Sequence, residues 1–231
     1  GEAAVWATVQ SGLNAGARDP LSLPTSRPPP NMNEAQPAIV RQTIPLHWHD
    51  NDNELVSPKW LVKKMLPETG VALISGQWSA GKTFVVLHLA ECVGIGRSFA
   101  GRKVKRKGGT LFMAAEAAGD VPIRLRGITA TPAHGDQGPL PFAWIEDVPC
   151  ISAVGALDRM IAFAKDAAAG MAEKFSLPLA LIVVDTMAAA AGFEDENAAA
   201  QAQVVMNVLH ELARATGALV IAVDHFGKDT S

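Results

Sequence analysis

Short apolar runs alternate with stretches of helical periodicity from about residue 71 onwards. The apolar runs predict five β-strands, at residues 71–75, 110–115, 141–145, 179–185 and 218–224. Between them, apolar residues at helical spacing predict helices at about 82–95, 119–129, 155–175 and 198–215, the last with Val204, Val208 and Leu212 on one face. This alternation is typical of an α/β fold in which helices cover both faces of a mostly parallel sheet.

The N-terminal part follows a different pattern. Residues 3–15 place Val5, Val9 and Leu13 at helical spacing beside Trp6, which predicts a short amphipathic linker helix within residues 1–19. Residues 20–45 carry seven of the 15 prolines, and such a segment stays extended and packs no core. We therefore expect a helix at 1–19, a proline-rich linker at 20–45 and a main domain at 46–231.

Composition narrows the class of protein only slightly. The 231 residues are 48% hydrophobic, enough for one substantial core, and the formal net charge of -3 neither favours nor excludes nucleic acid. Cys92 and Cys150 lie far apart and suggest neither a disulfide framework nor a metal site. No run reaches the roughly 18 apolar residues of a membrane span. We expect a cytoplasmic protein that does not enter a membrane.

A glycine-rich segment follows the first predicted strand and opens the first predicted helix. Its glycines let backbone N–H groups converge on phosphate oxygens, Lys82 reaches the β- and γ-phosphates and supports catalysis there, and the Thr83 hydroxyl ligates Mg²⁺. The pattern predicts a P-loop that binds ATP and Mg²⁺. The expected nucleotide-binding residues are Gly76, Gln77, Trp78, Ser79, Ala80, Gly81, Lys82, Thr83 and Phe84.

Two carboxylates stand at the ends of predicted strands. Asp185 ends the apolar run 181–185, where a P-loop enzyme needs an acidic partner for its metal ion. Many such enzymes carry a glutamate at the next position, but here it is Thr186, so the group that activates water must lie elsewhere. Glu116 closes the strand 110–115 at the same edge of the sheet. The alternative is that Glu116 caps the following helix.

A histidine follows the last predicted strand. His225 lies at the tip of the apolar run 219–223, one strand end from the phosphates, where it could sense the γ-phosphate through a hydrogen bond. It could equally be an ordinary loop histidine, and Asp224 could be the group that touches water or metal.

Four anchors follow one another along the chain: the P-loop at 76–83, Glu116, Asp185 with Thr186, and the segment 225–228 that begins with His225. In this order they resemble the RecA-type ATPase core, and in particular the hexameric replicative helicases of phages, plasmids and integrated elements. The resemblance runs from about Trp60 to the end of the chain. It implies that Glu116 is the catalytic base, that Asp185 binds Mg²⁺ through water and that His225 senses the γ-phosphate. It also implies a homo-oligomer, with a hexameric ring in the full-length protein, single-stranded DNA as a partner and a neighbouring primase-polymerase module.

The sequence departs from that family at one point. RecA-type rings complete the site with an arginine or lysine finger on strands beyond the histidine strand, and the sequence stops at Ser231. Because it also begins with Gly1, we expect a piece of a longer protein. Lys228, Arg124 and Arg126 are finger candidates within the chain, each more simply explained as a solvated or structural charge.

Other charged segments have simpler explanations. Residues 102–107 hold five cations in six positions and could contact phosphates, although the flanking glycines favour a solvated hairpin turn. The loop 188–197 would face DNA in a ring, yet its acidic residues 194–196 favour helix capping. Residues 47–50 resemble metal ligands without a second cluster, and Trp78 is expected to pack on neighbouring structure.

Three functions fit these features. The first is an ATP-hydrolysing motor domain, a DNA-dependent ATPase of the replicative helicase type from a mobile element. The second is a strand-exchange or clock-type RecA relative. The third is an ATP-gated assembly switch with little turnover, against which Glu116 argues because a switch needs no water-activating carboxylate.

Overall fold

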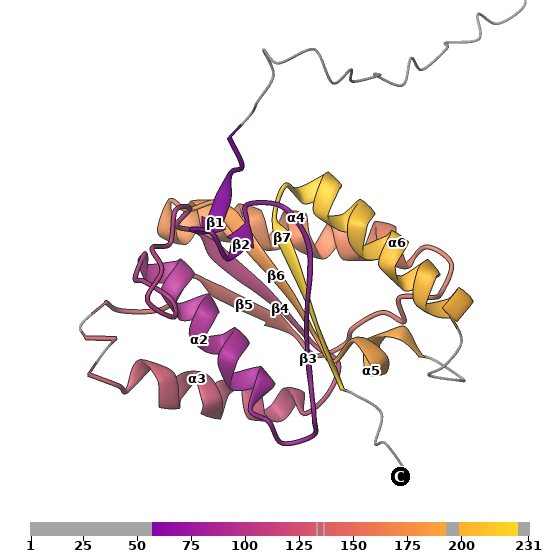
Figure 1. Cartoon of the computed structure of the whole chain (residues 1–231), viewed down its shortest axis with the longest axis horizontal. Helices are drawn as coiled ribbons and strands as arrows, with labels where there is room; N and C mark the ends of the chain where they lie inside the picture. Colours follow the sequence, from indigo (N-terminus) through magenta and orange to yellow (C-terminus); the bar gives the residue numbers. More distant parts are fainter. Residues whose placement is uncertain (1–56, 133, 136, 193–198, 226–231) are drawn as a thin grey trace, which may run out of the picture. The chain divides into compact units, whose positions relative to one another are not determined.

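The computed structural model describes residues 57–132, 134–135, 137–192 and 199–225. The predicted helix 1–19 and linker 20–45 lie outside these residues. The described chain begins with a hairpin of β1 (Trp60–Val62) and β2 (Leu66–Pro67). The five-stranded sheet comprises β3 (Gly70–Gly76), β4 (Gly109–Ala114), β5 (Phe142–Ile145), β6 (Leu179–Asp185) and β7 (Leu219–His225) (Figure 1).

The sheet is entirely parallel in the order β3-β7-β6-β4-β5. Helices connect its strands: α2 (Lys82–Ile95), the short 3-10 helix η2 (Ala118–Asp120) with α3 (Val121–Thr129), α4 (Ala156–Phe175), α5 (Met187–Ala191) and α6 (Ala199–Thr216). This is the RecA-like P-loop α/β fold that the alternating pattern predicted, with all five predicted strands present.

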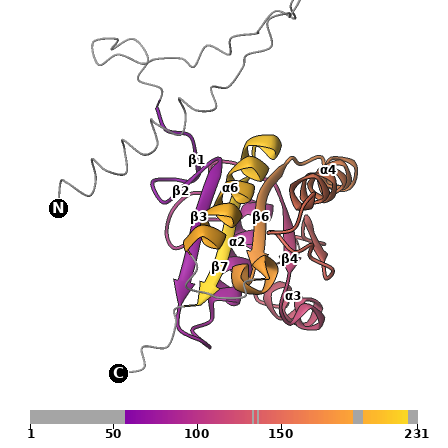
Figure 2. The same cartoon turned by 90° about the vertical axis from the view of Figure 1, so that its right-hand side faces the viewer.

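Successive side chains of each strand enter two different cores because strand residues alternate between faces. Phe112 and Val183 pack with α2 and α3, whereas Met113 and Val184 pack with α4, α5 and α6. Figures 1 and 2 show α2 and α6 on opposite faces of the sheet. Strand β6 is buried along its whole length, as expected for a central parallel strand.

Two local predictions need correction, and one element was not predicted. The β1–β2 hairpin was not predicted, because two or three residues per strand show no periodicity. The predicted loop 188–197 begins as helix: α5 covers 187–191, and the Thr186 hydroxyl caps it by accepting from the Ala189 N–H. Helix α6 buries Val205, Leu209 and Leu212 and packs Val208 against the core but leaves Val204 exposed, so the predicted face was right at Val208 and Leu212 and wrong at Val204.

None of the helices within the described ranges combines the length and apolarity that crossing a bilayer requires.

Gly108 and Gly170 provide a matched test of the packing at the start of β4. A Cβ at Gly108 would lie 2.5 Å from the Ala180 Cβ and 2.7 Å from the Pro178 carbonyl oxygen, which cannot move aside. Gly170, inside α4, has no atom within 4 Å of such a Cβ. We expect Gly108→Ala to lower the free energy of unfolding by about 1–3 kcal/mol through overpacking. Gly170→Ala should raise it by about 0.5–1 kcal/mol. Urea titration of both variants checks this, and equal midpoints would contradict the close approach.

Candidate active site

The P-loop connects β3 to α2 through a tight left-handed path. Ser79 has φ 60° and Gly81 has φ 78°, a region that glycine enters without steric cost. Gly81 is the N-cap of α2 and offers no side-chain acceptor to the first turn. The amide groups at this helix start therefore have no cap from a side chain, which suits an anionic ligand.

Lys82 is 7% exposed, and its ammonium group forms hydrogen bonds with the P-loop and with His225. Nζ donates to the carbonyl oxygens of Gly76 at 2.9 Å and Gln77 at 2.8 Å, and lies 2.7 Å from Nδ1 of His225. An ammonium group has only donors, so Nδ1 must be the acceptor and the proton of a neutral His225 ring sits on Nε2. The contact joins residues 143 positions apart.

Thr83 and Asp185 bring together the oxygen ligands expected for Mg²⁺. The Thr83 hydroxyl donates to Oδ2 of Asp185 at 2.7 Å. Burial raises the pKa of the Asp185 carboxyl, while the Thr83 hydrogen bond and the charge of Arg124 oppose this shift. A hydroxyl and a carboxylate are hard oxygen donors of the kind that Mg²⁺ prefers, so these two residues fit the ion.

Glu116 lies beside this pair and remains accessible. Its side chain is 44% exposed and accepts from the Thr186 hydroxyl at 3.0 Å. Oε2 lies 4.0 Å from Nε2 of His225. The N-cap of α3 is Asp120, and Glu116 makes no capping contact with the start of this helix in the described residues. The position therefore agrees better with a role in the pocket than with the helix-capping alternative.

One pocket of about 590 Å³ collects these groups. It is lined by Trp78, Ser79, Ala80, Gly81, Lys82, Thr83, Phe84, Glu116, Ala117, Arg124, Asp185, Thr186 and His225. Of the predicted nucleotide-binding residues, Gly76 and Gln77 do not line it but hold Lys82 through their carbonyl oxygens. The pocket thus brings Glu116, Asp185 and His225 together with the P-loop.

The contact between the rings of Trp78 and His225 in the pocket was not predicted from the sequence. The Trp78 indole stacks on the His225 imidazole with centroids 3.8 Å apart and planes 4° apart. This agrees with the expectation that Trp78 packs on neighbouring structure, and it leaves Trp78 59% exposed. No local pattern could have revealed the pair, because the residues come from β7 and from the loop after β3.

Of the finger candidates within the described residues, only Arg124 lines the pocket. Its Nη2 donates to Oδ2 of Asp120 at 2.8 Å, and its guanidinium carbon lies 5.6 Å from the Phe84 ring centroid. The other candidate in the described chain, Arg126, does not line the pocket. Lys228, residues 47–50 and the acidic positions 194–196 lie outside the described residues.

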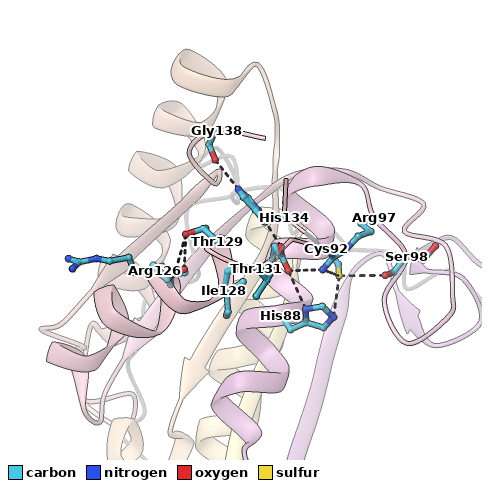
Figure 3. A network of polar contacts seen from close by, with 12 residues as sticks. His88, Cys92, Arg97, Ser98, Arg126, Ile128, Thr129, Thr131, His134 and Gly138 are labelled. Atoms are coloured by element: carbon cyan, nitrogen blue, oxygen red, sulfur yellow. Dashed lines mark hydrogen bonds and ion pairs between the residues drawn. The ribbon is translucent and has the colours of Figure 1, made fainter. Parts of the chain in front are cut away.

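A second polar cluster joins α2 to the loop after α3 (Figure 3). Glu91, 1% exposed, accepts from Arg97 at 2.8 Å and lies 3.2 Å from His88 Nδ1 and 3.3 Å from His134 Nδ1. Ligand atoms of His88, Glu91 and Cys92 lie within 4.8 Å of one another, a spacing that the sequence reasoning missed. The Arg97 guanidinium already supplies a positive charge here, and burial raises the pKa of the Cys92 thiol. The cluster is best explained as a structural anchor for the loop.

Comparison with known proteins identifies one family. A family model described as AAA domain matches residues 35–231. No curated protein matches the chain.

Asp185→Asn tests the electrostatics of the metal-binding position. A carboxyl whose pKa is raised by folding stabilises the fold at low pH, and this contribution is lost as the pH rises through its folded-state pKa. We expect Asp185→Asn to be at least as stable as the parent without ligand, with its advantage growing above about pH 4. The variant should also lose the increase in melting temperature that Mg²⁺-ATP gives the parent.

Asp166→Asn, an exposed change on α4, is the control and should alter neither property. A ligand-free Asp185→Asn protein that is less stable than the parent at neutral pH would contradict this account of the buried carboxylate.

Proposed function

This chain belongs to the AAA domain family of P-loop ATPases, and we propose that it is an ATP-hydrolysing motor domain whose turnover responds to DNA. The observation that carries the proposal is the run of contacts from Lys82 through His225 to Glu116. It connects the cation expected to bind the terminal phosphates with the carboxylate expected to activate water.

Each residue has a distinct part in the proposed reaction. Backbone N–H groups of the P-loop and the Lys82 ammonium group bind the phosphates and stabilise the negative charge that develops on them. Glu116 orients the attacking water and accepts its proton, which its exposed carboxylate can do from the edge of the pocket. Thr83 and Asp185 would hold Mg²⁺, which supplies charge neutralisation when bound.

His225 is suited to report the state of the phosphates. Lys82 has three donors, and one of them now points at His225 Nδ1. Phosphate oxygens compete for the same donors, so nucleotide binding would weaken this contact and free the imidazole to find other partners. Because His225 ends β7, the change would pass directly into the chain that follows this strand.

The replicative helicase type is the finer part of the proposal. It rests on the resemblance of the four anchors to the RecA-type core, with a hexameric ring, single-stranded DNA and a mobile-element origin as its implications. The assembly switch is the main alternative. The accessible Glu116 carboxylate beside the pocket favours turnover over a switch, since a switch has no use for a general base.

Glu116→Gln tests the proposed base. The change keeps the size of the side chain and its acceptor oxygen for the Thr186 hydroxyl, so the fold and ATP affinity should persist. We expect the ATP turnover rate to fall by about 10²–10⁴-fold, the usual contribution of a general base. Glu173→Gln, on the exposed surface of α4, should leave the rate unchanged. Full turnover in Glu116→Gln would reduce Glu116 to a structural partner of Thr186.

Lys82→Ala tests the P-loop itself. It removes the cation aimed at the β- and γ-phosphates, so nucleotide binding or hydrolysis should be abolished. A change in intrinsic tryptophan fluorescence on ATP addition that is absent from Trp78→Phe provides a binding readout, because Trp78 stacks on His225 at the pocket and the subtraction removes the other four tryptophans. Parent-level turnover in the variant would rule out the P-loop assignment.

Turnover measured with and without single-stranded DNA separates the motor from the switch. We expect DNA to raise the rate several-fold, and light scattering with ATP present to report a multimer. A rate that ignores DNA, together with ATP-dependent assembly, would favour the switch.

A further inference from the structure

Two basic segments that are distant in the sequence lie side by side at the start of the sheet. Val62 of β1 forms an antiparallel bridge with Val104. The Lys63 N–H donates to the Lys103 carbonyl oxygen at 2.9 Å, and the Lys105 N–H donates to the Leu61 carbonyl oxygen at 2.8 Å. The run 102–107 is therefore more than a turn, because part of it pairs with the β1–β2 hairpin.

This pairing gathers seven exposed cations, which we call the amino-edge patch: Lys59, Lys63, Lys64, Arg102, Lys103, Lys105 and Lys107. Within the described residues none of the seven forms an ion pair with a carboxylate. Arg106 behaves differently and is not part of the patch. It donates to the carbonyl oxygens of Gly217 and Leu179 and lies 3.7 Å from Glu68, so it is structural.

The arrangement has an electrostatic cost. The Val62–Val104 bridge places Lys63 opposite Lys103, and both side chains are exposed. Like charges directly opposite on paired strands destabilise the pairing. An anionic ligand would offset this repulsion.

We propose that the amino-edge patch binds the phosphate backbone of a nucleic acid without sequence preference. Phosphate contacts from lysines position a protein on nucleic acid and carry no base information. Met65 is the only exposed large apolar side chain of the described chain within the hairpin and the run 102–107. Trp60 of β1 is only partly exposed, so within the described residues the hairpin and the run 102–107 offer no exposed aromatic ring for base stacking and only Met65 as an exposed apolar anchor for a protein interface.

The patch lies at the opposite edge of the sheet from the nucleotide pocket. Arg106 binds carbonyl groups at the start of β6 and just before β7, whereas the pocket lies at the carboxyl ends of the same strands. Figure 1 shows β1 and β2 at the end of the sheet opposite the arrowheads that mark the carboxyl ends of its strands. Phosphate binding at the patch therefore leaves the P-loop free. The proposal rests on the proposed DNA-dependent ATPase and adds to it a surface that binds nucleic acid. Its test measures binding alone and does not depend on ATP turnover.

The test compares Lys63→Gln/Lys103→Gln with the matched control Lys165→Gln/Lys174→Gln, which removes two exposed cations from α4. Binding of the full chain to labelled duplex DNA and to oligothymidylate is measured by fluorescence anisotropy without nucleotide, over a range of salt concentrations. The patch variant should bind both more weakly. For the duplex, its slope of log affinity against log salt should be shallower by about 2, or about 1 for each lysine. The control should match the parent in binding. The patch variant should keep the basal ATP turnover of the parent and melt at or slightly above the parent's temperature, because the repulsion between Lys63 and Lys103 is removed.

Three outcomes would overturn the proposal. The first is an affinity and salt slope equal to those of the control variant. The second is parent binding to polyglutamate as tight as to DNA, which would indicate an acidic protein partner, and the third is equally tight binding to anionic lipid vesicles. Turnover that ignores DNA while patch-dependent binding persists would instead defeat the proposed motor function and support the patch.

Discussion

The site depends on the parallel pairing of β6 with β4 and β7. β6 is buried from Leu179 to Asp185, and its register aligns Ala114 with Asp185 while β3 and β7 align Gly76 with His225. A slip of one residue would turn every side chain of a strand to the other face and would move Asp185 away from Thr83. The packing of the two cores therefore sets the positions of the groups in the pocket.

Two buried charges in the pocket have only neutral hydrogen-bond partners in the described residues. Lys82 donates to two carbonyl oxygens and an imidazole, and Asp185 accepts from a hydroxyl. Within the described residues neither forms an ion pair. Buried charges without counter-charges are unfavourable, and preorganised ones are typical of sites that stabilise charge on a ligand. A triphosphate with a divalent cation offers the opposite charge to each of them.

The sheet also separates two kinds of electrostatic surface. The carboxyl edge of the sheet holds the pocket, which contains a small number of charged groups in fixed positions. The amino edge carries exposed lysines that form no ion pair with a carboxylate of the described residues. The Arg106 contacts to Gly217 and Leu179 anchor the basic segment to the strands that end in the pocket. Both surfaces are thus attached to one rigid element, although they face different ligands.

The sequence by itself determined the five strands, the P-loop and the strand-end positions of Glu116 and Asp185, because periodicity and glycine spacing are local properties. It did not determine the stacking of Trp78 on His225 or the bond from Lys82 to His225, since these join distant segments. The pairing of Lys63 with Lys103 likewise appears only in the folded chain. Local patterns specify elements, whereas strand order and register decide which elements meet, and only tertiary packing sets those.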